Sequence, residues 1–317
     1  MNNKIVEVND LVKYFDVKSG FFTGKINEVK AVDNISFEIA KGESLGLVGQ
    51  SGCGKTTTAR IMTLLEEKTS GSIKFFDSKS NTMIDLDEIK DEDIQSFRSQ
   101  VQMIFQDPYE SLNPRWNIKN IVSEPLNIHN LGTESDRVEA VLEMLRTVGI
   151  TPPENYLERY PHELSGGQRQ RVSIARALIM KPSFVICDEP TSMLDVSIRI
   201  SIMDLMLNLA KDLGVSYLYI THDLAVARYM CERIAVMYNG KILEIADTEE
   251  LLSNPIHPYT KRLISSIPIP DPNYKRIKYE LDFTEVNNII NKSKKTGMIE
   301  VSKNHFISSN DFSDDLQ

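Results

Sequence analysis

The chain has 317 residues, 41% of them hydrophobic, which is enough for one large domain with additions or for two domains, each with a buried core. Its formal net charge of -9 argues against nucleic acid as the main partner, because binding to a phosphate backbone needs a basic surface. Its three cysteines, Cys53, Cys187 and Cys231, form no Cys-x-x-Cys pair, so neither a disulfide framework nor a zinc site is expected.

The first part of the chain carries short strand patterns around a polar stretch. Residues 5–8, 35–39 and 72–76 alternate or are rich in β-branched side chains, and we expect them to form an antiparallel layer. Residues 16–30 are polar, contain glycines and show no period, so an inserted loop is predicted there. Residues 43–48 have the pattern of a short apolar strand that ends where the next feature begins.

A glycine-rich segment, residues 49–56, follows the pattern Gly-x-x-x-x-Gly-Lys-Ser/Thr between this strand and the helical pattern of residues 57–65. The glycines let successive backbone N–H groups point into one concavity at a helix N-terminus, where phosphate oxygens fit. We expect Lys55 to reach the β- and γ-phosphates and the Thr56 hydroxyl to bind magnesium. A thiolate at Cys53 is favoured by the helix N-terminus and by Lys55. The predicted nucleotide-binding residues are Gly49, Gln50, Ser51, Gly52, Cys53, Gly54, Lys55, Thr56 and Thr57.

A strand pattern at residues 101–105 ends in Gln106, whose amide carries both a donor and an acceptor. At the end of a strand this side chain can touch magnesium or the attacking water. The pattern then becomes helical, with apolar residues three and four apart. The predicted helices cover residues 118–126, 137–148 and 168–179, and together they form an inserted helical subdomain at about 107–179.

Two later strand patterns also end in side chains that are candidates for metal binding or catalysis. The apolar run 184–187 is followed by Asp188 and Glu189, at the strand end where α/β folds place ligands. We expect Asp188 to hold magnesium through water and Glu189 to polarise the attacking water as a general base. The strand pattern 216–220 leads to His222, which we expect at the γ-phosphate. A solvated strand end and a structural histidine are the alternatives, and the phosphate loop favours the functional interpretation.

Residues 164–168, Leu-Ser-Gly-Gly-Gln, open the last of the predicted helices. With this segment the motifs resemble, in order, those of the ATP-binding-cassette family: the Walker A loop, the Q-loop glutamine, the signature, the Walker B strand, the D-loop at residues 192–195 and the switch histidine. The resemblance covers residues 4 to 250. It implies an α/β fold, namely a P-loop NTPase with a RecA-like core, an antiparallel β layer, the helical subdomain and a short C-terminal extension.

The resemblance also implies a composite site for ATP and Mg²⁺. In the family two nucleotide domains face head to tail, and each ATP lies between one phosphate loop and the other signature. The signature residues here are Ser165, Gly166, Gly167 and Gln168, and Asp195 of the D-loop is expected to join the nucleotide contacts. In the family an aromatic side chain near the first strand stacks on adenine. Phe15 fits that spacing best, and Tyr14 is the rival.

Three further segments, residues 106–115, 160–163 and 254–260, are similar to those of the oligopeptide, dipeptide and nickel importers within the family. The last of them begins the C-terminal extension, residues 251–317, after a nucleotide-binding domain at 1–250. Many relatives carry cysteines in this extension, some with an iron-sulfur cluster, but residues 271–317 contain none, so no cluster is expected. The polar composition past residue 303 predicts a poorly ordered end.

The resemblance implies an ATPase that powers uptake of oligopeptides or dipeptides, with a nickel or metal-chelate importer and a soluble non-transport ATPase as the alternatives. Its expected partners are two transmembrane permeases, a second homologous ATPase and, indirectly, an extracytoplasmic solute-binding protein. No run of 18 apolar residues occurs, so we expect the chain itself not to span the membrane. The resemblance implies a peripheral place at the cytoplasmic face of the cell membrane. A P-loop kinase would have no use for the signature, and an exporter more often fuses membrane spans to the cassette.

Overall fold

The computed structural model describes residues 4–19, 25–266 and 297–308. The chain divides into two compact units, each of which is considered by itself. Unit 1 contains residues up to 6, residues 39–43 and residues 74–218; unit 2 contains residues 7–38, 44–73 and the chain from 219 onward. Across the described parts, no helix combines the length and the hydropathy needed to cross a membrane.

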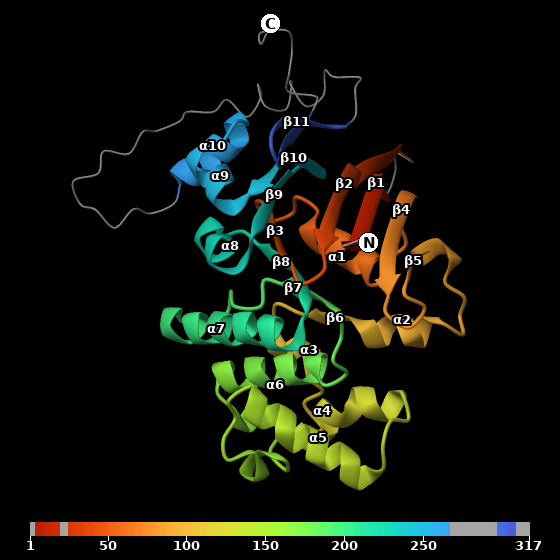
Figure 1. Cartoon of the computed structure of the whole chain (residues 1–317), viewed down its shortest axis with the longest axis vertical. Coiled ribbons are helices and arrows are strands. Elements are labelled where there is room, and N and C mark those ends of the chain that lie inside the picture. Colours follow the sequence, from red (N-terminus) through yellow and green to blue (C-terminus); the bar gives the residue numbers. More distant parts are fainter. Residues whose placement is uncertain (1–3, 20–24, 267–296, 309–317) are drawn as a thin grey trace, which may run out of the picture. The chain divides into compact units, whose positions relative to one another are not determined.

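Unit 2 is built on a sheet in which β11, β12, β10, β9 and β3 are neighbours in that order (Figure 1). β3 runs parallel to β9, whereas β9, β10, β12 and β11 pair antiparallel. The bounds are β3 (Ser44–Val48), β9 (Arg233–Tyr238), β10 (Lys241–Asp247), β11 (Met298–Ser302) and β12 (His305–Ser308). All residues of β3 are buried, as expected for a strand that is covered on both faces.

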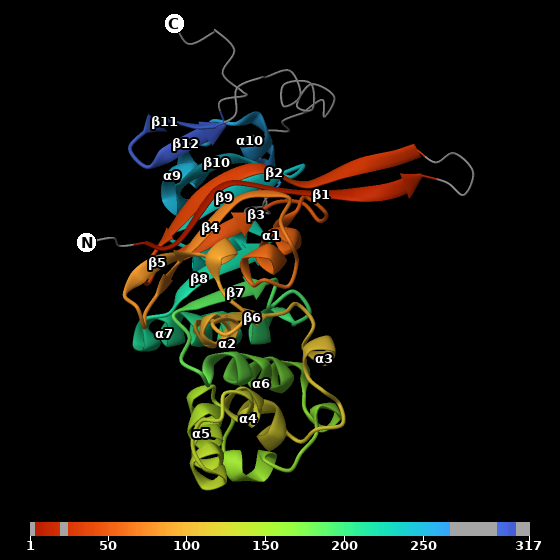
Figure 2. The same cartoon turned by 90° about the vertical axis from the view of Figure 1, so that its right-hand side faces the viewer.

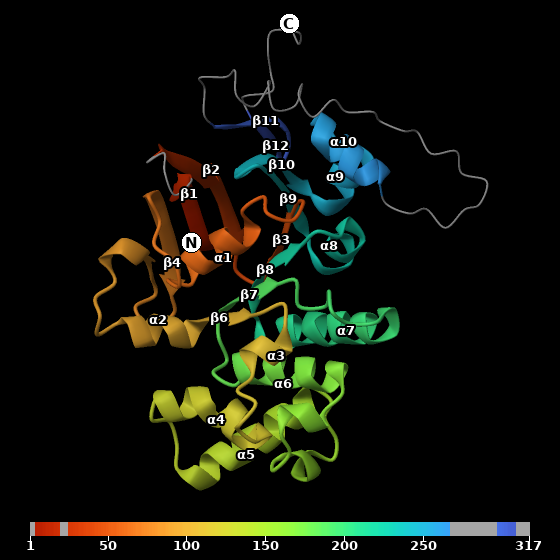
Figure 3. The same ribbon diagram turned by 180° about the vertical axis from the view of Figure 1, so that it is seen from behind.

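Helices cover this sheet and bring the C-terminal extension into the core of unit 2 (Figures 1 and 3). They are α1 (Lys55–Met62), α8 (Leu224–Met230), α9 (Thr248–Ser253) and α10 (Pro258–Ser265). One hydrophobic cluster joins Val48 of β3, Leu224 of α8, Leu251 of α9 and Tyr259 of α10. The ring of Tyr259 lies 4.6 Å from that of Tyr238. The extension is therefore part of the core on which the strand before the phosphate loop packs.

The first strands differ from the sequence expectation. β1 (Lys4–Ser19) and β2 (Lys25–Ala40) are neighbouring strands that form a long two-stranded ribbon in Figure 2. The predicted loop at 16–30 is therefore wrong for the described residues on either side of 20–24. Asp16, Val29 and Lys30 are exposed in these strand ends. Polar and apolar residues alternate where one face of a strand is buried, so that signal is missing from the sequence here.

Unit 1 contains the parallel pair β6 (Val101–Ile104) and β7 (Phe184–Asp188), with Ile104 opposite Cys187. The boundary between the units passes through β8 (Ser216–Thr221) and through β4 (Ser70–Asp77), whose end pairs antiparallel with β5 (Thr82–Asp85). The remaining helices of this unit are α2 (Ile94–Gln100), α3 (Pro108–Ser111), α4 (Ile118–Ile128), α5 (Glu134–Thr147), α6 (Gly166–Leu178) and α7 (Val196–Leu213).

The three predicted helices of the insert appear as α4, α5 and α6, which pack on one another in Figure 1. Local capping explains where two of them begin. Thr133 and Asp136 form a reciprocal capping box at α5, and Ser165 and Gln168 form one at α6. These helices belong to unit 1, whereas the described part of the extension belongs to unit 2. The domain boundaries drawn from the sequence stay a prediction.

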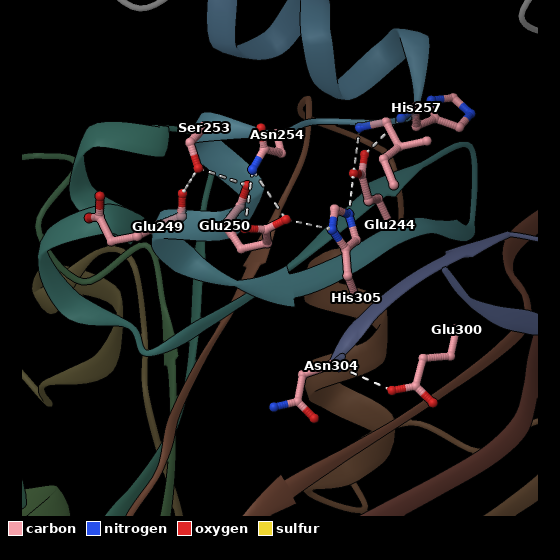
Figure 4. A network of polar contacts seen from close by, with 10 residues as sticks. Glu244, Glu249, Glu250, Ser253, Asn254, His257, Glu300, Asn304 and His305 are labelled. Atoms are coloured by element: carbon pink, nitrogen blue, oxygen red, sulfur yellow. Dashed lines mark hydrogen bonds and ion pairs between the residues drawn. The ribbon is translucent and has the colours of Figure 1, made fainter. Parts of the chain in front are cut away.

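The C-terminal hairpin is ordered where the sequence predicts a poorly ordered end. His305 begins β12 and is buried against Glu244 of β10, as the close-up in Figure 4 shows. Strand β12 also pairs with β10, with Ile307 opposite Glu244. The expectation of disorder past residue 303 is therefore wrong for 304–308, because a polar segment can order when one buried side-chain hydrogen bond and a strand ladder hold it. Residues 309–317 lie outside the described residues.

Candidate nucleotide site

The phosphate loop in unit 2 requires glycine at both of its ends. A Cβ atom on Gly49 would lie 2.1 Å from the carbonyl oxygen of Met237 in β9, and one on Gly54 would lie 2.1 Å from that of Ala31. Gly54 also has a φ of 110°, a conformation that residues with a side chain rarely adopt. The glycines predicted to form the loop thus let it curl tightly against neighbouring backbone, directly before helix α1 begins at Lys55.

Lys55 lies folded over this loop. Its side chain is 5% exposed, and its Nζ donates to the carbonyl oxygens of Gly49, at 2.7 Å, and Gln50, at 3.0 Å. The ammonium thus sits at the concave backbone of the loop, where a bound phosphate would be within its reach. Backbone N–H groups and a cation at the start of a helix form a site for a polyanion.

The thiol of Cys53 differs from the expectation. Its Sγ lies 3.9 Å from Lys55 Nζ, but the side chain is buried, with 5% of its surface exposed. Burial raises the pKa of the Cys53 thiol above its ordinary value, and the nearby Lys55 charge offsets this only in part. The predicted thiolate is therefore wrong, because desolvation outweighs attraction to the cation at this position.

The two aromatic candidates for adenine follow one another in β1, so their side chains leave opposite faces of the strand. The Tyr14 hydroxyl donates to Asp33 at 2.5 Å. Burial and this hydrogen bond raise the pKa of Tyr14 to about 12. Lys13 Nζ lies 4.7 Å from the centre of the Phe15 ring. Tyr14 thus has a structural role in holding Asp33, and the assignment of Phe15 to adenine stays a prediction.

His222 is exposed and directly follows β8, as predicted. The next residue, Asp223, caps helix α8 by accepting from the backbone N–H of Ala225 at 2.8 Å. Its own N–H donates to the Thr221 hydroxyl at 3.0 Å. These two hydrogen bonds fix the backbone on both sides of His222. The histidine is held at a strand end in the same unit as the phosphate loop.

In unit 1, the parallel strands β6 and β7 bring Gln106 and Glu189 together. The Gln106 amide Nε2 lies 3.5 Å from Glu189 Oε2 and 3.3 Å from the Ser192 hydroxyl. The same hydroxyl donates to the Glu189 carbonyl oxygen at 3.0 Å. Glu189 has a φ of 47°, which turns the chain sharply after β7. A carboxylate and an amide therefore converge at one sheet edge, as a water-activating site needs.

Ser192 is a residue that sequence reasoning missed as part of this arrangement. It lies in the segment assigned to the D-loop, and its hydroxyl connects the side chain of Gln106 to the backbone of Glu189. Its position three residues after Glu189 could have suggested it, because a serine hydroxyl commonly bonds a nearby backbone carbonyl. We assign Ser192 to the site as a positioning residue.

The signature residues form the start of α6. Gln168 N–H donates to the Ser165 hydroxyl at 3.3 Å, and Ser165 N–H donates to the Gln168 side chain at 3.0 Å. Gln168 also donates to the Tyr156 hydroxyl at 3.2 Å. The N-terminus of a helix this long carries a partial positive charge and unused N–H groups, so it suits a phosphate.

Asp195 and Asp188 occupy different environments. Asp195 is exposed and caps helix α7, where its carboxylate accepts from Ile198 N–H at 3.1 Å and from the Ser197 hydroxyl at 3.0 Å. These hydrogen bonds lower the pKa of Asp195. Asp188 ends β7 and is buried, with 7% of its surface exposed. The Asp195 carboxylate, which is predicted to contact the nucleotide, therefore also caps helix α7.

Comparison with known proteins identifies the family. Residues 32–192 match the family model of the ABC transporter, and residues 243–289 match that of the oligopeptide/dipeptide transporter C-terminal region. The chain belongs to the ABC transporter family. Its ATP-binding cassette makes it an ATPase of the ABC type, and the predicted α/β P-loop NTPase fold is confirmed.

Relatives and solved structures agree with this assignment. The oligopeptide transport ATP-binding protein AppF of Bacillus subtilis is 48% identical over 84% of this chain and 78% of its own length. OppF of the same organism, also an oligopeptide transport ATP-binding protein, is 44% identical over 97% of this chain and 96% of its own. A dimeric post-hydrolysis structure of the ATP-binding cassette MJ0796, bound to ADP and Pi, matches with a TM-score of 0.65 and 29% identity, covering 77% of this chain and 98% of that one.

Proposed function

We propose that this ABC ATPase powers the uptake of oligopeptides or dipeptides across a cell membrane. Relatives that match nearly the whole chain are named as oligopeptide transport ATP-binding proteins. The match to the oligopeptide/dipeptide C-terminal region supports the same substrate class. In unit 2, α9 and α10 of that region pack in the same hydrophobic cluster as Val48, which precedes the phosphate loop.

The roles of the phosphate-loop residues follow from their chemistry. The backbone of Gly49 to Gly54 binds the phosphates, Lys55 neutralises the β- and γ-phosphates, and Thr56 and Thr57 follow in the first turn of α1. His222 contacts the γ-phosphate, and Phe15 stacks on adenine.

Glu189 is the general base of the reaction in this proposal. The convergence of Gln106, Ser192 and Glu189 is the observation that carries it, since it fixes a carboxylate beside an amide that can orient water. The carboxylate takes a proton from the attacking water, the water oxygen bonds to the γ-phosphorus, and the bond from that phosphorus to the β,γ-bridging oxygen breaks, so that ADP and phosphate are the products.

Magnesium fits the donor set. Thr56, Gln106 and Asp188 offer a hydroxyl, an amide oxygen and a carboxylate, which are the hard oxygen donors that Mg²⁺ prefers. Among the described residues, no group of three or more His, Cys, Asp or Glu side chains could hold a metal alone. The ion would neutralise charge on the β- and γ-phosphates.

Two ATPase subunits are expected to cooperate in this function. Ser165, Gly166, Gly167 and Gln168 serve the ATP held by the phosphate loop of a second, homologous subunit, and Asp195 contributes at the same junction. Two permeases form the membrane path, and a solute-binding protein delivers the peptide. The chain then works at the cytoplasmic face of the membrane. A nickel or metal-chelate importer with the same architecture is the second candidate.

Uptake in the source cells tests the substrate class. We expect deletion of this chain to abolish uptake of labelled oligopeptides or dipeptides, and a plasmid copy to restore it. A copy with Lys55→Ala should fail, because the phosphate loop loses its cation. The matched control is Lys211→Ala, which changes an exposed lysine in the last turn of α7. Loss of nickel uptake with unchanged peptide uptake would contradict the proposal and favour the alternative.

A further inference from the structure

Tyr259, near the start of α10, packs beside both strands that border the phosphate loop. It shares a hydrophobic cluster with Val48, the last residue of β3, which directly precedes Gly49. Its ring lies 4.6 Å from that of Tyr238, the last residue of β9. Tyr259 is 2% exposed. A residue of the C-terminal extension is therefore enclosed next to the strand that leads into the loop.

The hydroxyl of Tyr259 lies where packing alone does not explain it. Among the described residues, this buried oxygen has no hydrogen bond within the usual limits of distance and angle. Burial raises the pKa of Tyr259 to about 12, and the backbone N–H of Gln50 opposes this rise as a hydrogen-bond donor. The Gln50 N–H therefore faces the hydroxyl oxygen, although the contact falls short of a formed hydrogen bond.

The opposite side of the same peptide unit is held by Lys55. Lys55 Nζ donates to the carbonyl oxygen of Gly49 at 2.7 Å, and this carbonyl and the Gln50 N–H belong to one planar peptide. The peptide is trans, so its C=O and its N–H point in opposite directions. The peptide that joins Gly49 to Gln50 thus lies between two side chains, the Lys55 ammonium and the Tyr259 hydroxyl.

The orientation of this peptide decides how the loop curls. The carbonyl oxygen of Gln50 accepts from the Cys53 N–H at 3.3 Å and from Lys55 Nζ at 3.0 Å, so Gln50 connects the first half of the loop to the start of α1. Gly49 has no side chain to resist rotation of the peptide that follows it. A rotation at this point would therefore move the N–H groups that form the concavity for phosphate.

A bound phosphate changes the balance between the two contacts. Its oxygens compete with the carbonyls of Gly49 and Gln50 for the Lys55 ammonium, and hydrogen bonds between charged groups are the stronger ones. When Lys55 turns to the phosphate, it stops holding the peptide through the carbonyl of Gly49. The Tyr259 hydroxyl lies on the other side of the peptide, so it can hold the N–H while Lys55 exchanges its partners.

The backbone of Tyr259 is anchored independently of its hydroxyl. Its N–H donates to His257 Nδ1 at 2.9 Å, which caps α10. The His257 N–H in turn donates to the carboxylate of Glu244 in β10 at 3.0 Å, a contact that Figure 4 shows. Removal of the hydroxyl therefore leaves the helix and the ring in place, and the loop can be tested without disturbing the extension.

We propose that Tyr259 is a positioning residue of the phosphate loop, whose hydroxyl accepts the Gln50 N–H and holds the Gly49–Gln50 peptide while Lys55 binds the phosphates of ATP. The inference deepens the proposed function and rests on it, since that function assigns the phosphates to this loop. Polar contacts of this kind often tighten when the ligand binds. The C-terminal extension thereby takes part in nucleotide binding.

Nucleotide binding by the purified full chain tests this role. Tyr259→Phe keeps the ring and removes the hydroxyl. We expect the Kd for a non-hydrolysable ATP analogue with magnesium to rise about two- to tenfold, the value of a hydrogen bond of about 0.5–1.4 kcal/mol. Urea unfolding should show no loss of stability, because a buried hydroxyl without a partner does not stabilise the fold. A variant that loses stability while its Kd is unchanged would mark the hydroxyl as structural and overturn the proposal.

Thr260→Val is the matched control. Thr260 is the next residue of α10, is also buried, and its hydroxyl likewise has no hydrogen bond within the described part of the chain. The variant removes this second hydroxyl and keeps a branched side chain of similar shape, so we expect the Kd of the wild type. A rise in Kd that both variants share would overturn the proposal, because it would reflect repacking of α10 and not the contact with Gln50.

Steady-state ATP hydrolysis by the complete transporter separates positioning of the loop from the chemical step. In Tyr259→Phe the KM for ATP should rise while kcat at saturating ATP is unchanged, whereas a fall in kcat with an unchanged KM would overturn the proposal. Lys55→Ala shows which claim fails. If it loses ATP binding while Tyr259→Phe binds like the wild type, this inference fails and the proposed function stands. If Lys55→Ala binds ATP like the wild type, the phosphate assignment fails, and this inference fails with it.

Discussion

Glu244 and His305 form a buried pair that joins two strands 61 positions apart in the chain, with Glu244 Oε1 2.7 Å from His305 Nε2. Their side chains are 0% and 1% exposed. The Glu244 carboxylate also accepts the backbone N–H groups of Ile256, at 2.8 Å, and His257, at 3.0 Å. Figure 4 shows this carboxylate between the hairpin and the start of α10. One side chain therefore organises both described parts of the C-terminal extension.

His305→Ala should destabilise unit 2 by about 1–3 kcal/mol, because it removes a buried side-chain hydrogen bond with Glu244 and leaves that carboxylate with its two backbone donors. Urea unfolding measures this loss. The double variant Glu244→Gln with His305→Ala should lose less than the sum of the single variants, since the two side chains contact each other directly. Lys303→Ala, at an exposed neighbouring position with ordinary backbone conformation, is the control and should change stability by less than about 0.5 kcal/mol. A His305→Ala variant as stable as this control would contradict the role of the pair.

Ser192→Ala should lower the kcat of ATP hydrolysis roughly tenfold and leave the KM for ATP unchanged. The hydroxyl holds both the Gln106 amide and the Glu189 backbone, and two hydrogen bonds of this kind are together worth about 1–1.5 kcal/mol. Steady-state kinetics on the assembled transporter provides the measurement. Ser197→Ala, which removes a hydroxyl bound to Asp195 instead, serves as the control. An equal loss in both variants would indicate a general effect on the loop and not positioning of the base.

Asp77 gives a pH dependence with a defined sign. Burial acts to raise the pKa of Asp77, but hydrogen bonds from Gln100 and Ser80 prevail and lower it to about 2. The stabilisation is therefore present above the unfolded pKa of about 4 and disappears as the pH falls toward 2. For this partly exposed group we expect Asp77→Asn to cost about 1 kcal/mol or less at pH 6. Denaturant unfolding should show the two proteins converging near pH 2; a constant difference would be the contrary result.

Cys53 should react slowly with alkylating reagents, because burial raises the pKa of its thiol and lowers its thiolate fraction. The labelling rate should reach its half-maximum above the pH typical of a free thiol. Magnesium-ATP should slow it further by covering the loop. The Cys53→Ala variant shows which part of the labelling comes from Cys53, because the chain has two further buried thiols, Cys187 and Cys231. Fast labelling near neutral pH that nucleotide does not affect would contradict this placement of the thiol.

The sequence predicts the features that depend on local patterns. The phosphate loop follows from glycines and a lysine at fixed spacing, and the close approach of Gly49 and Gly54 to neighbouring backbone explains why that spacing is needed. Helix α6 follows from its capping box and its apolar period. Such signals lie within a few residues, so one chain is enough to read them.

Features that depend on distant contacts could not be predicted in this way. The Ser192 bridge exists only because β6 and β7 pair in parallel and bring Gln106 beside Glu189. Arg169 has the residue type of a solvated helix face, yet it is buried beneath Tyr109. The burial of His305 depends on a carboxylate far away in the sequence. Tertiary contacts determine whether such side chains are buried, whereas their polar character alone predicts that they are exposed.

Glu189→Gln tests the central claim, ATP hydrolysis by a sandwich of two subunits, most directly. The substitution keeps shape and hydrogen bonding but removes the base, so hydrolysis should fall by ~10²-fold or more while ATP still binds. Bound ATP should then hold the closed dimer together. The measurement is molecular mass in solution with magnesium-ATP, with and without the second ATPase. We expect a stable dimer that contains this chain, whereas a protein that stays monomeric in both mixtures, or hydrolyses ATP at the wild-type rate, would contradict the account.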